Sequence, residues 1–458
     1  MKGSGADALL VPEGLDDALG KAIAALSGSE GAVRIVTHYD ADGLSAGGVM
    51  CRALLRIGRP FHVRVTRKPE PAFFESLADE DYRLNIFLDC GSGQLELVER
   101  LRGNAIVLDH HKPGAPPKRA IEVNPHRYGI DGATELSAST LAYLFARKLD
   151  RCNVNLFPYA LAGALGDRQD LGGLRGLNKG LLAEAEKAGV VEQKRALKLA
   201  EGKVRASISD SINPYFKGLG GREDAVKSLL SSIGISADAD LSALTPDERR
   251  ALTSILTLRL LEHGAPPESV AELNPMRYWS TELEIFVDRL SGMINACGRM
   301  GDEATGLAVC LGDASAVEAA KKHREAYLAM VREGLAMLEG DGAKQMAGLQ
   351  YFWWDNPAIT GSICGLGVQF VLDKSKPVFG LTEEGDKVSI SARGTRALVA
   401  AGLDLSAACR EAAGAVGGRG GGHDVASGAT VPKGKAEEFL AIADAIVSKH
   451  LGRISKGP

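Results

Sequence analysis

Residues 32–43 read AVRIVTHYDADG. The run begins with β-branched apolar residues, which are typical of a buried strand. It ends with His38, Asp40 and Asp42, followed by Gly43. Three potential metal ligands therefore lie close together at the place where the strand is expected to stop. Their role depends on which other side chains reach the same place.

Strand-like and helix-like segments alternate through the N-terminal third of the chain. The strand-like runs cover 32–37, 61–66, 86–89, 105–109 and 120–123. Segments 44–58 and 93–103 have helical spacing. This alternation predicts an α/β fold with a mostly parallel sheet flanked by helices. In such sheets, ligands bind beyond the carboxyl ends of the strands.

The domain organisation follows from the length and from two changes of pattern. A chain of 458 residues is too long for one ordinary core, so two or three domains are expected. Helical patterns dominate the middle of the chain, and mixed α/β patterns return near its end. We predict a catalytic domain over 1–190, a mainly helical insert over 191–340 and a smaller C-terminal α/β domain over 345–458.

The composition is that of an ordinary globular protein, with 45% hydrophobic and 24% charged residues. The 7 cysteines form no C-x-x-C pair, which favours free thiols in a reducing cytoplasm over a disulfide framework. No signal-peptide pattern or membrane-length apolar run is present, so a cytoplasmic protein without a membrane partner is expected. The net charge of -4 gives no sign of a nucleic-acid partner, although a basic groove can lie on an acidic protein.

Potential ligands recur in four stretches, each after an apolar run. The stretches are HYDADG (38–43), LDCGSG (88–93), LDHHKP (108–113) and LGDRQD (165–170). They contain these carboxylates and imidazoles: Asp40, Asp42, Asp89, Asp109, Asp167, Asp170, His38, His110 and His111. Gathered at one sheet edge, so many acids would repel one another unless cations are bound.

The mixture of oxygen and imidazole ligands suits Mn²⁺ best, with Mg²⁺ or Zn²⁺ as alternatives. Two such ions can hold a phosphate, supply a hydroxide and stabilise the leaving oxygen of a displacement. Each stretch also has an ordinary structural explanation. Asp42-Gly43 is a common strand-exit turn, and Asp89 or Asp167 could cap a helix. A His-His pair is more often structural than metal-bound, but the four stretches together favour a metal site.

The order of these stretches and their residues resemble the motifs of the DHH superfamily of phosphoesterases, named for the Asp-His-His at 109–111. The segment GGRGGGHDVASGATVP (417–432) resembles the glycine-rich part of the DHH-associated domain. The resemblance implies a catalytic lobe and a substrate-binding lobe, with the active site in the cleft between them. It also implies these roles: one metal on His38 and Asp40, a second on Asp42, His110 and Asp167, Asp89 as the bridge, His111 facing the scissile phosphate, and Asp109 orienting an imidazole.

The C-terminal glycine run GGRGGGH (417–423), which we predict to be a loop, gives a second candidate site. Consecutive glycines allow backbone N–H groups to form an anion nest, with Arg419 and His423 available for a phosphate. The alternative is a flexible hinge. The candidate substrate-binding residues, including the family-like SISAR (389–393), are Ser391, Arg393, Arg419, Gly420, Gly421, Gly422 and His423. Asp424 departs from the proline that commonly follows the family's histidine. The aromatic cluster YFWW (351–354) could stack bases, but it is more typical of core.

Three further segments, 135–140, 163–170 and 278–301, look like archaeal RecJ-like proteins. This resemblance implies a Mn²⁺-dependent exonuclease that releases mononucleotides from single-stranded DNA or RNA in replication or repair. It also implies association with the GINS component of the replicative helicase. Two alternatives stay open: a hydrolase of short oligonucleotides or small phosphoesters, and a replisome scaffold with little activity. The scaffold is disfavoured because every ligand motif is intact.

Overall fold

The computed structural model describes residues 10–452 and separates into two compact units. The first comprises the chain up to Ala196 together with Met276–Glu325. The second comprises Leu197–Pro275 together with the chain from Ala326 onward. Residues 191–340, expected as one helical insert, are therefore divided between the two units. Among the described helices, none is long and apolar enough to cross a membrane.

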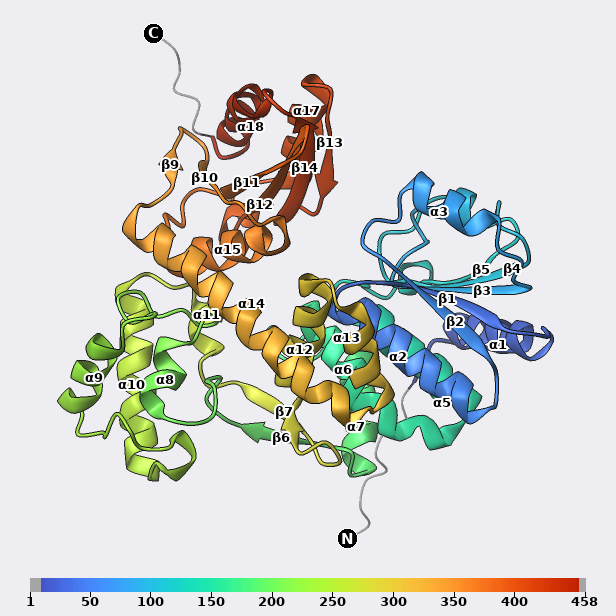
Figure 1. Ribbon diagram of the computed structural model, residues 1–458, viewed down its shortest axis with the longest axis horizontal. Coiled ribbons are helices and arrows are strands. Elements are labelled where there is room, and N and C mark those ends of the chain that lie inside the picture. The colour runs from blue at the N-terminus through green and yellow to red at the C-terminus, as the bar shows by residue number, and fades with distance from the viewer. Residues whose placement is uncertain (1–9, 453–458) are drawn as a thin grey trace. The chain divides into compact units, whose positions relative to one another are not determined.

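The first unit is built on a five-stranded parallel sheet in the order β2-β1-β3-β4-β5 (Figure 1). Its strands are β1 (Val33–His38), β2 (Phe61–Thr66), β3 (Leu84–Leu88), β4 (Asn104–Leu108) and β5 (Ile121–Val123). The five predicted runs thus form one sheet, and the predicted α/β class is confirmed. Alternate residues of a strand enter different cores, as Ile86 and Phe87 of β3 do.

Helices cover both faces of this sheet, as predicted. The helices of the first unit are α1 (Glu13–Ser27), α2 (Ala41–Arg56), α3 (Pro71–Ala78), α4 (Leu95–Val98), α5 (Ala138–Leu149), α6 (Phe157–Gly166), α7 (Gly176–Lys187), α12 (Val287–Met300) and α13 (Glu303–Leu311), with the 3₁₀ turns η1 (Pro125–Tyr128) and η2 (Arg151–Leu156). Segment 93–103 forms only the short α4, although Leu95, Val98 and Leu101 are buried with helical spacing.

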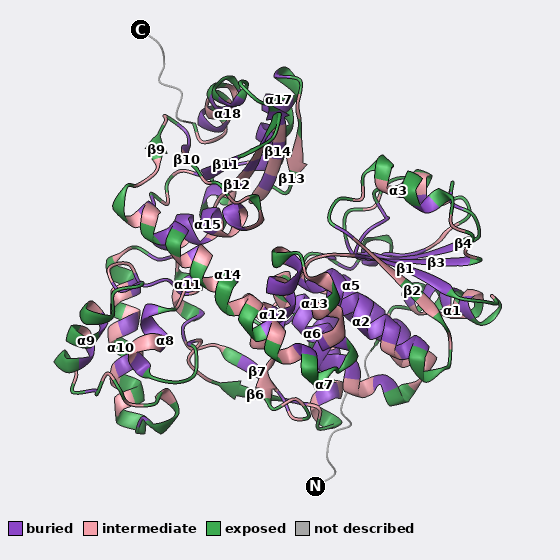
Figure 2. Ribbon diagram, viewed as in Figure 1, coloured by how far each residue is buried: buried purple, intermediate pink, exposed green. Residues whose placement is uncertain are grey.

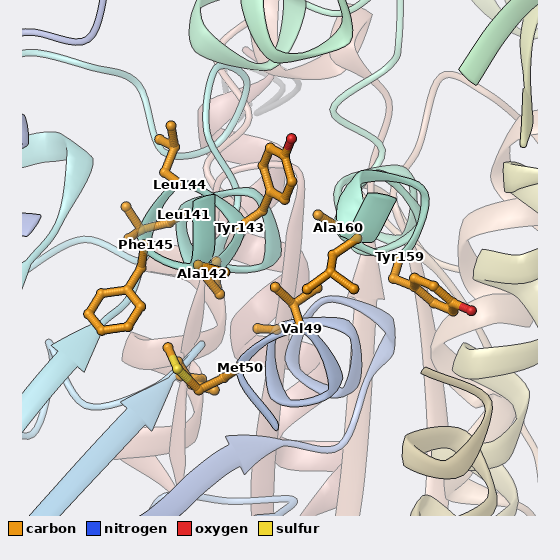
Figure 3. Packing of buried hydrophobic residues seen from close by; sticks show 14 of the residues in the cluster. Val49, Met50, Leu141, Ala142, Tyr143, Leu144, Phe145, Tyr159 and Ala160 are labelled. Atoms are coloured by element: carbon orange, nitrogen blue, oxygen red, sulfur yellow. The ribbon is translucent and has the colours of Figure 1, made fainter. Parts of the chain in front are cut away.

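The large core lies where α2, α5 and α6 pack together (Figure 3). Val49 and Met50 of α2 lie next to Ala142 of α5, and Ala160 of α6 belongs to the same core. Small residues at these contacts let the helices approach closely, and α2 is buried along most of its length (Figure 2). The carboxyl ends of the strands are therefore held on a rigid support.

A small antiparallel sheet explains why residues after 276 belong to the first unit. It consists of β6 (Val191–Arg195), β7 (Met276–Ser280) and β8 (Ile285–Phe286), in the order β6-β7-β8. The pairing of β6 with β7 closes a long excursion of the chain. The helices α12 and α13 that follow then pack against α6 and α2.

The second unit contains a six-stranded sheet in the order β13-β14-β12-β11-β10-β9. Its strands are β9 (Lys344–Gln345), β10 (Gln350–Trp353), β11 (Val378–Glu384), β12 (Lys387–Arg393), β13 (Arg419–Gly422) and β14 (Ala426–Pro432). Its helices are α8 (Val204–Ser209), α9 (Glu223–Ser232), α10 (Pro246–Glu262), α11 (Pro267–Ala271), α15 (Pro357–Phe370), α16 (Arg396–Ala400), α17 (Leu405–Ala415) and α18 (Ala436–His450), with the turn η3 (Leu241–Ala243). Helix α14 (Ala314–Gly340) begins in the first unit and ends in the second.

The glycine run expected as a loop forms the edge strand β13, so that part of the prediction is wrong. Gly421 and Gly422 have φ angles of 156° and 140°, which favour glycine, and both pair with β14. A side chain on Gly420 would collide with the backbone carbonyl of Cys409 in α17. The glycines thus allow a strand to lie directly against a helix. The aromatic cluster is divided, with Phe352 buried and Trp353 38% exposed.

Candidate metal centre

The carboxyl ends of β1, β3 and β4 place the predicted ligands at one edge of the parallel sheet. His38 ends β1, Asp89 directly follows β3, and His110 lies two residues after β4. Asp40 is the N-cap of α2, where its side chain accepts a hydrogen bond from the Gly43 amide at 3.1 Å. Capping and a candidate ligand role therefore coincide at this aspartate.

Asp89 has an unusual backbone. Its φ angle of 57° lies in the left-handed region, which few residues other than glycine adopt. Its side chain is buried, and its amide donates to the Leu108 carbonyl at 3.0 Å, so it does not cap a helix. Strained residues of this kind often lie at functional sites, where the surrounding structure holds them.

The structure brings the candidate ligands together in three overlapping groups. In each group the possible ligand atoms lie within 4.8 Å of one another. The groups are His38–Asp40–Asp89, Asp89–His110–His111 and Asp42–His110–Asp167. Asp170, the sixth carboxylate considered from the sequence, is in none of them.

Asp89 connects two of these groups with its two carboxylate oxygens. Asp89 Oδ2 lies 3.5 Å from His38 Nδ1, and that nitrogen lies 2.9 Å from Asp40 Oδ2. Asp89 Oδ1 lies 3.3 Å from His110 Nε2 and 3.7 Å from His111 Nδ1. His110 Nε2 also lies 3.2 Å from Asp167 Oδ2. This two-sided position is the geometry that a bridging ligand requires.

The donor set fits divalent cations. His38 Nδ1, Asp89 Oδ1 and His110 Nε2 are buried and have no hydrogen-bond partner. His110 directs its other nitrogen, Nδ1, to the Gly132 carbonyl at 2.7 Å, so in its neutral form the ring turns the lone pair of Nε2 toward the carboxylates. Lone pairs that face one another are unfavourable, so either a proton or a cation must lie between these groups.

The charges give the same indication. Burial, reinforced by the nearby Asp89 charge, raises the pKa of Asp42 to about 6. Burial and the charge of Asp42 raise the pKa of Asp167 well above its usual value. Burial opposes protonation of His38, but Asp40 and Asp89 outweigh it and raise the pKa of His38 to about 11. Protons thus hold this cluster together where no cation does.

Asp109 and His111 form a separate pair beside these groups. Asp109 is buried, and its Oδ1 accepts hydrogen bonds from the backbone and the ring Nδ1 of His111, at 3.1 Å and 2.8 Å. Its Oδ2 accepts from the Ser92 amide at 2.9 Å. His111 is about half exposed, with 49% of its side chain accessible. Asp109 therefore orients a ring that solvent or a substrate can reach.

Two arginines near Asp40 were not anticipated. Arg299, at the end of α12, donates to the Tyr39 hydroxyl at 2.7 Å. Burial alone would raise the pKa of Asp40, but His38 lowers this pKa most, and the charge of Arg299 lowers it further. Arg67 and Arg299 both lie over the Tyr39 ring, at 4.7 Å and 5.2 Å from its centroid. Arg299 lies in segment 278–301, whose resemblance to archaeal RecJ-like proteins was its only sign, because that segment was expected to belong to the helical insert over 191–340.

The C-terminal candidates are brought together only in part. Ser391 and Arg393 lie on the same face of β12, and both pack against Gly361 of α15, where a Cβ atom would lie 3.4 Å from Ser391 Oγ and 3.0 Å from an Arg393 guanidinium nitrogen. Arg393 donates to the Ser427 carbonyl at 3.2 Å, and Ser427 in turn donates to the His423 carbonyl at 2.7 Å. The described contacts thus place His423 near Arg393.

Arg419 lies apart from these residues. It is exposed and pairs with Thr430 at the start of β13, in the same row of the sheet as Ser389. The register therefore separates Arg419 from Arg393 by four residues along β12.

Comparison with known proteins identifies the family. Residues 32–165 match the DHH family, N-terminal domain, and residues 359–449 match the DHHA1 domain. An uncharacterized protein from Methanocaldococcus jannaschii is 33% identical over 432 residues, which are 92% of this chain and 95% of that protein. The chain belongs to the DHH family. The resemblance to this phosphoesterase family is confirmed, and a role in phosphoester hydrolysis follows at that general level.

Within the DHH family, the single-stranded-DNA-specific exonuclease RecJ of Thermus thermophilus is 29% identical over 260 residues. That match covers 52% of this chain and only 39% of RecJ. The crystal structure of that RecJ with Mn²⁺ has a TM-score of 0.60 at 18% identity, covering 97% of this chain and 56% of RecJ. CDC45 from Entamoeba histolytica has a TM-score of 0.65 at 9% identity, with 95% and 98% covered. The two structures share the fold with this DHH protein.

Proposed function

We propose that the protein is a divalent-cation-dependent phosphodiesterase that acts as an exonuclease on single-stranded DNA or RNA and releases mononucleotides. The observation that carries this proposal is the two-sided carboxylate of Asp89. The buried imidazole nitrogens His38 Nδ1 and His110 Nε2, which have no hydrogen-bond partner, face it from its two sides. Membership of the DHH family supports phosphodiester chemistry at such a centre.

In this proposal, His38 and Asp40 hold one ion, Asp42, His110 and Asp167 hold another, and Asp89 serves both. The mixture of imidazole and carboxylate ligands favours Mn²⁺, with Mg²⁺ or Zn²⁺ as alternatives. Crystal structures of Thermus thermophilus RecJ in complex with Mn²⁺ and with Mg²⁺ support these choices. Two bound cations would supply Lewis-acid stabilisation of the charge that develops on a phosphodiester.

The chain's own residues supply orientation and hydrogen bonding. Asp109 holds His111 Nδ1, which leaves the opposite ring nitrogen, Nε2, for a substrate. We assign His111 to the scissile phosphate, because its ring is the accessible one of the His-His pair. We assign the guanidinium of Arg299 to a phosphate oxygen near the first ion. Its Nε–H group is buried without a hydrogen-bond partner and can still donate to a phosphate oxygen.

Substrate binding is assigned to the second unit as well. Ser391, Arg393 and His423 cluster around the end of β12, where a phosphate group of a nucleic-acid strand would find hydroxyl, guanidinium and imidazole groups. We assign the backbone of the glycines in β13 to contacts with the nucleic-acid strand. These glycines are Gly420, Gly421 and Gly422, and Arg419 begins the same β-strand.

The biological setting is proposed from the relatives. RecJ, by its name, is a single-stranded-DNA-specific exonuclease, which supports a single-stranded substrate and a link to replication or repair. Association with the GINS component of the replicative helicase stays a proposal from the resemblance to archaeal RecJ-like proteins. The likeness to CDC45 concerns the fold alone.

The test is a cleavage assay on end-labelled strands. DNA and RNA of several lengths, each labelled at either end, are incubated with the protein and Mn²⁺. Release of mononucleotides from long strands is expected, and it should disappear in Asp89→Asn. Asp79→Asn, an exposed aspartate at the end of α3, is the matched control and should cleave like wild type.

Each other outcome identifies a different function. Cleavage restricted to strands of a few nucleotides would replace the proposal with a short-oligonucleotide hydrolase. A folded protein that cleaves no substrate with Mn²⁺, Mg²⁺ or Zn²⁺ would refute the enzyme and favour a scaffold.

A further inference from the structure

Two sequence segments meet at the carboxylate of Asp42: 135–140, which the proposed chemistry leaves unused, and 163–170, of which it uses only Asp167. Asp42 is fully buried in the first turn of α2, and the start of α5 faces it. Ser137 is the N-cap of α5, and Ser139 lies two residues further on. These two serines belong to ELSAST, and Gly163 belongs to GALGDRQD.

The two oxygens of Asp42 have very different surroundings. Oδ1 accepts hydrogen bonds from the Ser137 hydroxyl at 2.8 Å, from the Ser139 amide at 3.1 Å and from the Ser139 hydroxyl. Oδ2 accepts only the Ala138 amide, at 2.7 Å, and it lies 3.7 Å from His110 Nε2. A carboxylate oxygen offers two lone pairs. The Ser137 hydroxyl and the Ser139 amide already occupy both lone pairs of Oδ1, and the Ser139 hydroxyl, whose single hydrogen is shared between Oδ1 and the Ala160 carbonyl, lies against the same oxygen. Oδ2 keeps one lone pair on the side of His110.

Gly163 explains how this arrangement fits between the helices. A Cβ atom on Gly163 of α6 would lie 2.6 Å from Asp42 Oδ1 and would collide with the Ser139 hydroxyl. The Ser139 hydroxyl also lies 2.7 Å from the Ala160 carbonyl of α6. The absent side chain thus leaves the space that the serine and the carboxylate fill. Any larger residue would push one of them away.

We propose that Ser139, with the start of α5 and the open side of Gly163, positions Asp42 so that only Oδ2 is offered to a divalent cation. This inference rests on the proposed function and extends it in two ways. Asp42 becomes a ligand through one oxygen for the ion shared with His110 and Asp167. Ser139 becomes a positioning residue for that ion, with no contact to the substrate.

The reason for such positioning is geometric. A freely rotating carboxylate would exchange its two oxygens and could bind an ion through both. Because Ser137 and Ser139 hold Oδ1, Asp42 has one orientation. The side chain therefore loses no further conformational entropy when the ion binds. Groups that orient a ligand in this way change metal affinity or activity about 10–100-fold when they are removed.

The experiment compares three full-length proteins by isothermal titration calorimetry with MnCl₂: wild type, Ser139→Ala and the matched control Ser45→Ala. Ser45 is equally buried in α2 of the same unit, but it interacts with Cys310, and the described hydrogen bonds to the Asp42 carboxylate all come from 137–139. Wild type and Ser45→Ala should bind two ions alike. Ser139→Ala should bind one ion normally and the other about 10-fold or more weakly.

Kinetics supply a second readout. The Mn²⁺ concentration that gives half-maximal cleavage should rise in Ser139→Ala by the same factor. KM for the strand at saturating Mn²⁺ should stay within about twofold of wild type, because Ser139 does not touch the strand. Ser139→Cys, which keeps most of the volume and only a weak donor, should change in the same direction by a smaller factor. It serves as the test if the alanine variant does not fold.

Three results overturn the inference. The first is a folded Ser139→Ala or Ser139→Cys that binds both ions with wild-type affinity while wild type binds and cleaves; the proposed function then stands and only the role of Ser139 falls. The second is an equal loss of Mn²⁺ affinity in Ser45→Ala, which would show that any small cavity in this core weakens ion binding. The third is a wild-type protein that binds no Mn²⁺, in which case the proposed function falls as well.

Discussion

Replacing Asp89 with asparagine should change the stability of the protein little without metal. With Mn²⁺ present, the same substitution should remove most of the stabilisation that the metal gives to wild type. Asparagine has nearly the same shape and tolerates the left-handed backbone of this position, where φ is 57°. The substitution therefore removes one negative charge and one ligand oxygen without forcing the chain to move. Both changes act on the groups that meet at Asp89.

Without metal, the variant should be close to wild type in stability, because two effects of the lost charge oppose each other. The charge of Asp89 is the second cause, after burial, of the raised pKa of Asp42, so the two carboxylates repel each other. Removing that charge relieves the repulsion, but it also removes the attraction between Asp89 and the protonated rings of His38 and His110. A neutral amide also has an N–H group for the carboxylates around it.

With Mn²⁺, wild type should be strongly stabilised and the variant should not. An ion at 100 times its dissociation constant adds about 2.7 kcal/mol to the free energy of unfolding. Two ions that share Asp89 would add about 5 kcal/mol. For a unit of this size, each kcal/mol raises Tm by about 2–4 °C, so a shift of about 10–20 °C is expected. Loss of the shared ligand should remove most of it.

Differential scanning calorimetry checks this directly, because the two units give the measurement an internal control. Every candidate metal ligand lies in the first unit. Only the transition of that unit should move with Mn²⁺. An Asp89→Asn protein that keeps the full shift, or a wild-type shift confined to the second unit, would refute the bridging role of Asp89.

The remaining predictions concern the other assigned residues. His111→Ala should lower kcat by about 10²–10⁴-fold and leave Mn²⁺ binding by calorimetry within a few-fold of wild type, whereas equal loss of both would make His111 a ligand instead. His423→Ala should raise KM for a single strand more than it lowers kcat, and an unchanged KM with a collapsed kcat would contradict the assignment. Gly420→Ala should lower the Tm of the second unit, because its Cβ would collide with Cys409; in contrast, Gly414→Ala in α17 has open space around it and should stabilise the unit by about 0.5–1 kcal/mol. Equal melting of these two variants would show that β13 is not packed as described.

The sheet of the first unit could be predicted because its signals are local. β-branched runs with helical segments between them specify parallel strands, and the carboxyl ends of such strands lie at one edge. His38, Asp89 and His110 follow three strands, so their proximity follows from the topology alone. The two-sided position of Asp89 did not, because it depends on a left-handed backbone that no residue pattern specifies.

The glycine-rich segment shows a different limit. Gly420, Gly421 and Gly422 indicated a loop because glycine disfavours strands. Their tertiary neighbours decide otherwise: β14 supplies the pairing, and α17 lies too close for any side chain at Gly420. A local propensity was overridden by packing that only the folded unit provides.

Arg299 shows why the division of the chain mattered most for the site. Arg299 follows the mainly helical residues 197–275 of the second unit, and the residue pattern alone predicted one helical insert over 191–340. The pairing of β6 with β7 returns the chain to the first unit, and α12 then packs on the loop after β1. Gly298 makes this contact possible, since a side chain there would collide with the Tyr39 carbonyl. The result is a guanidinium beside Asp40, so the charge balance of the centre depends on residues far apart in the sequence.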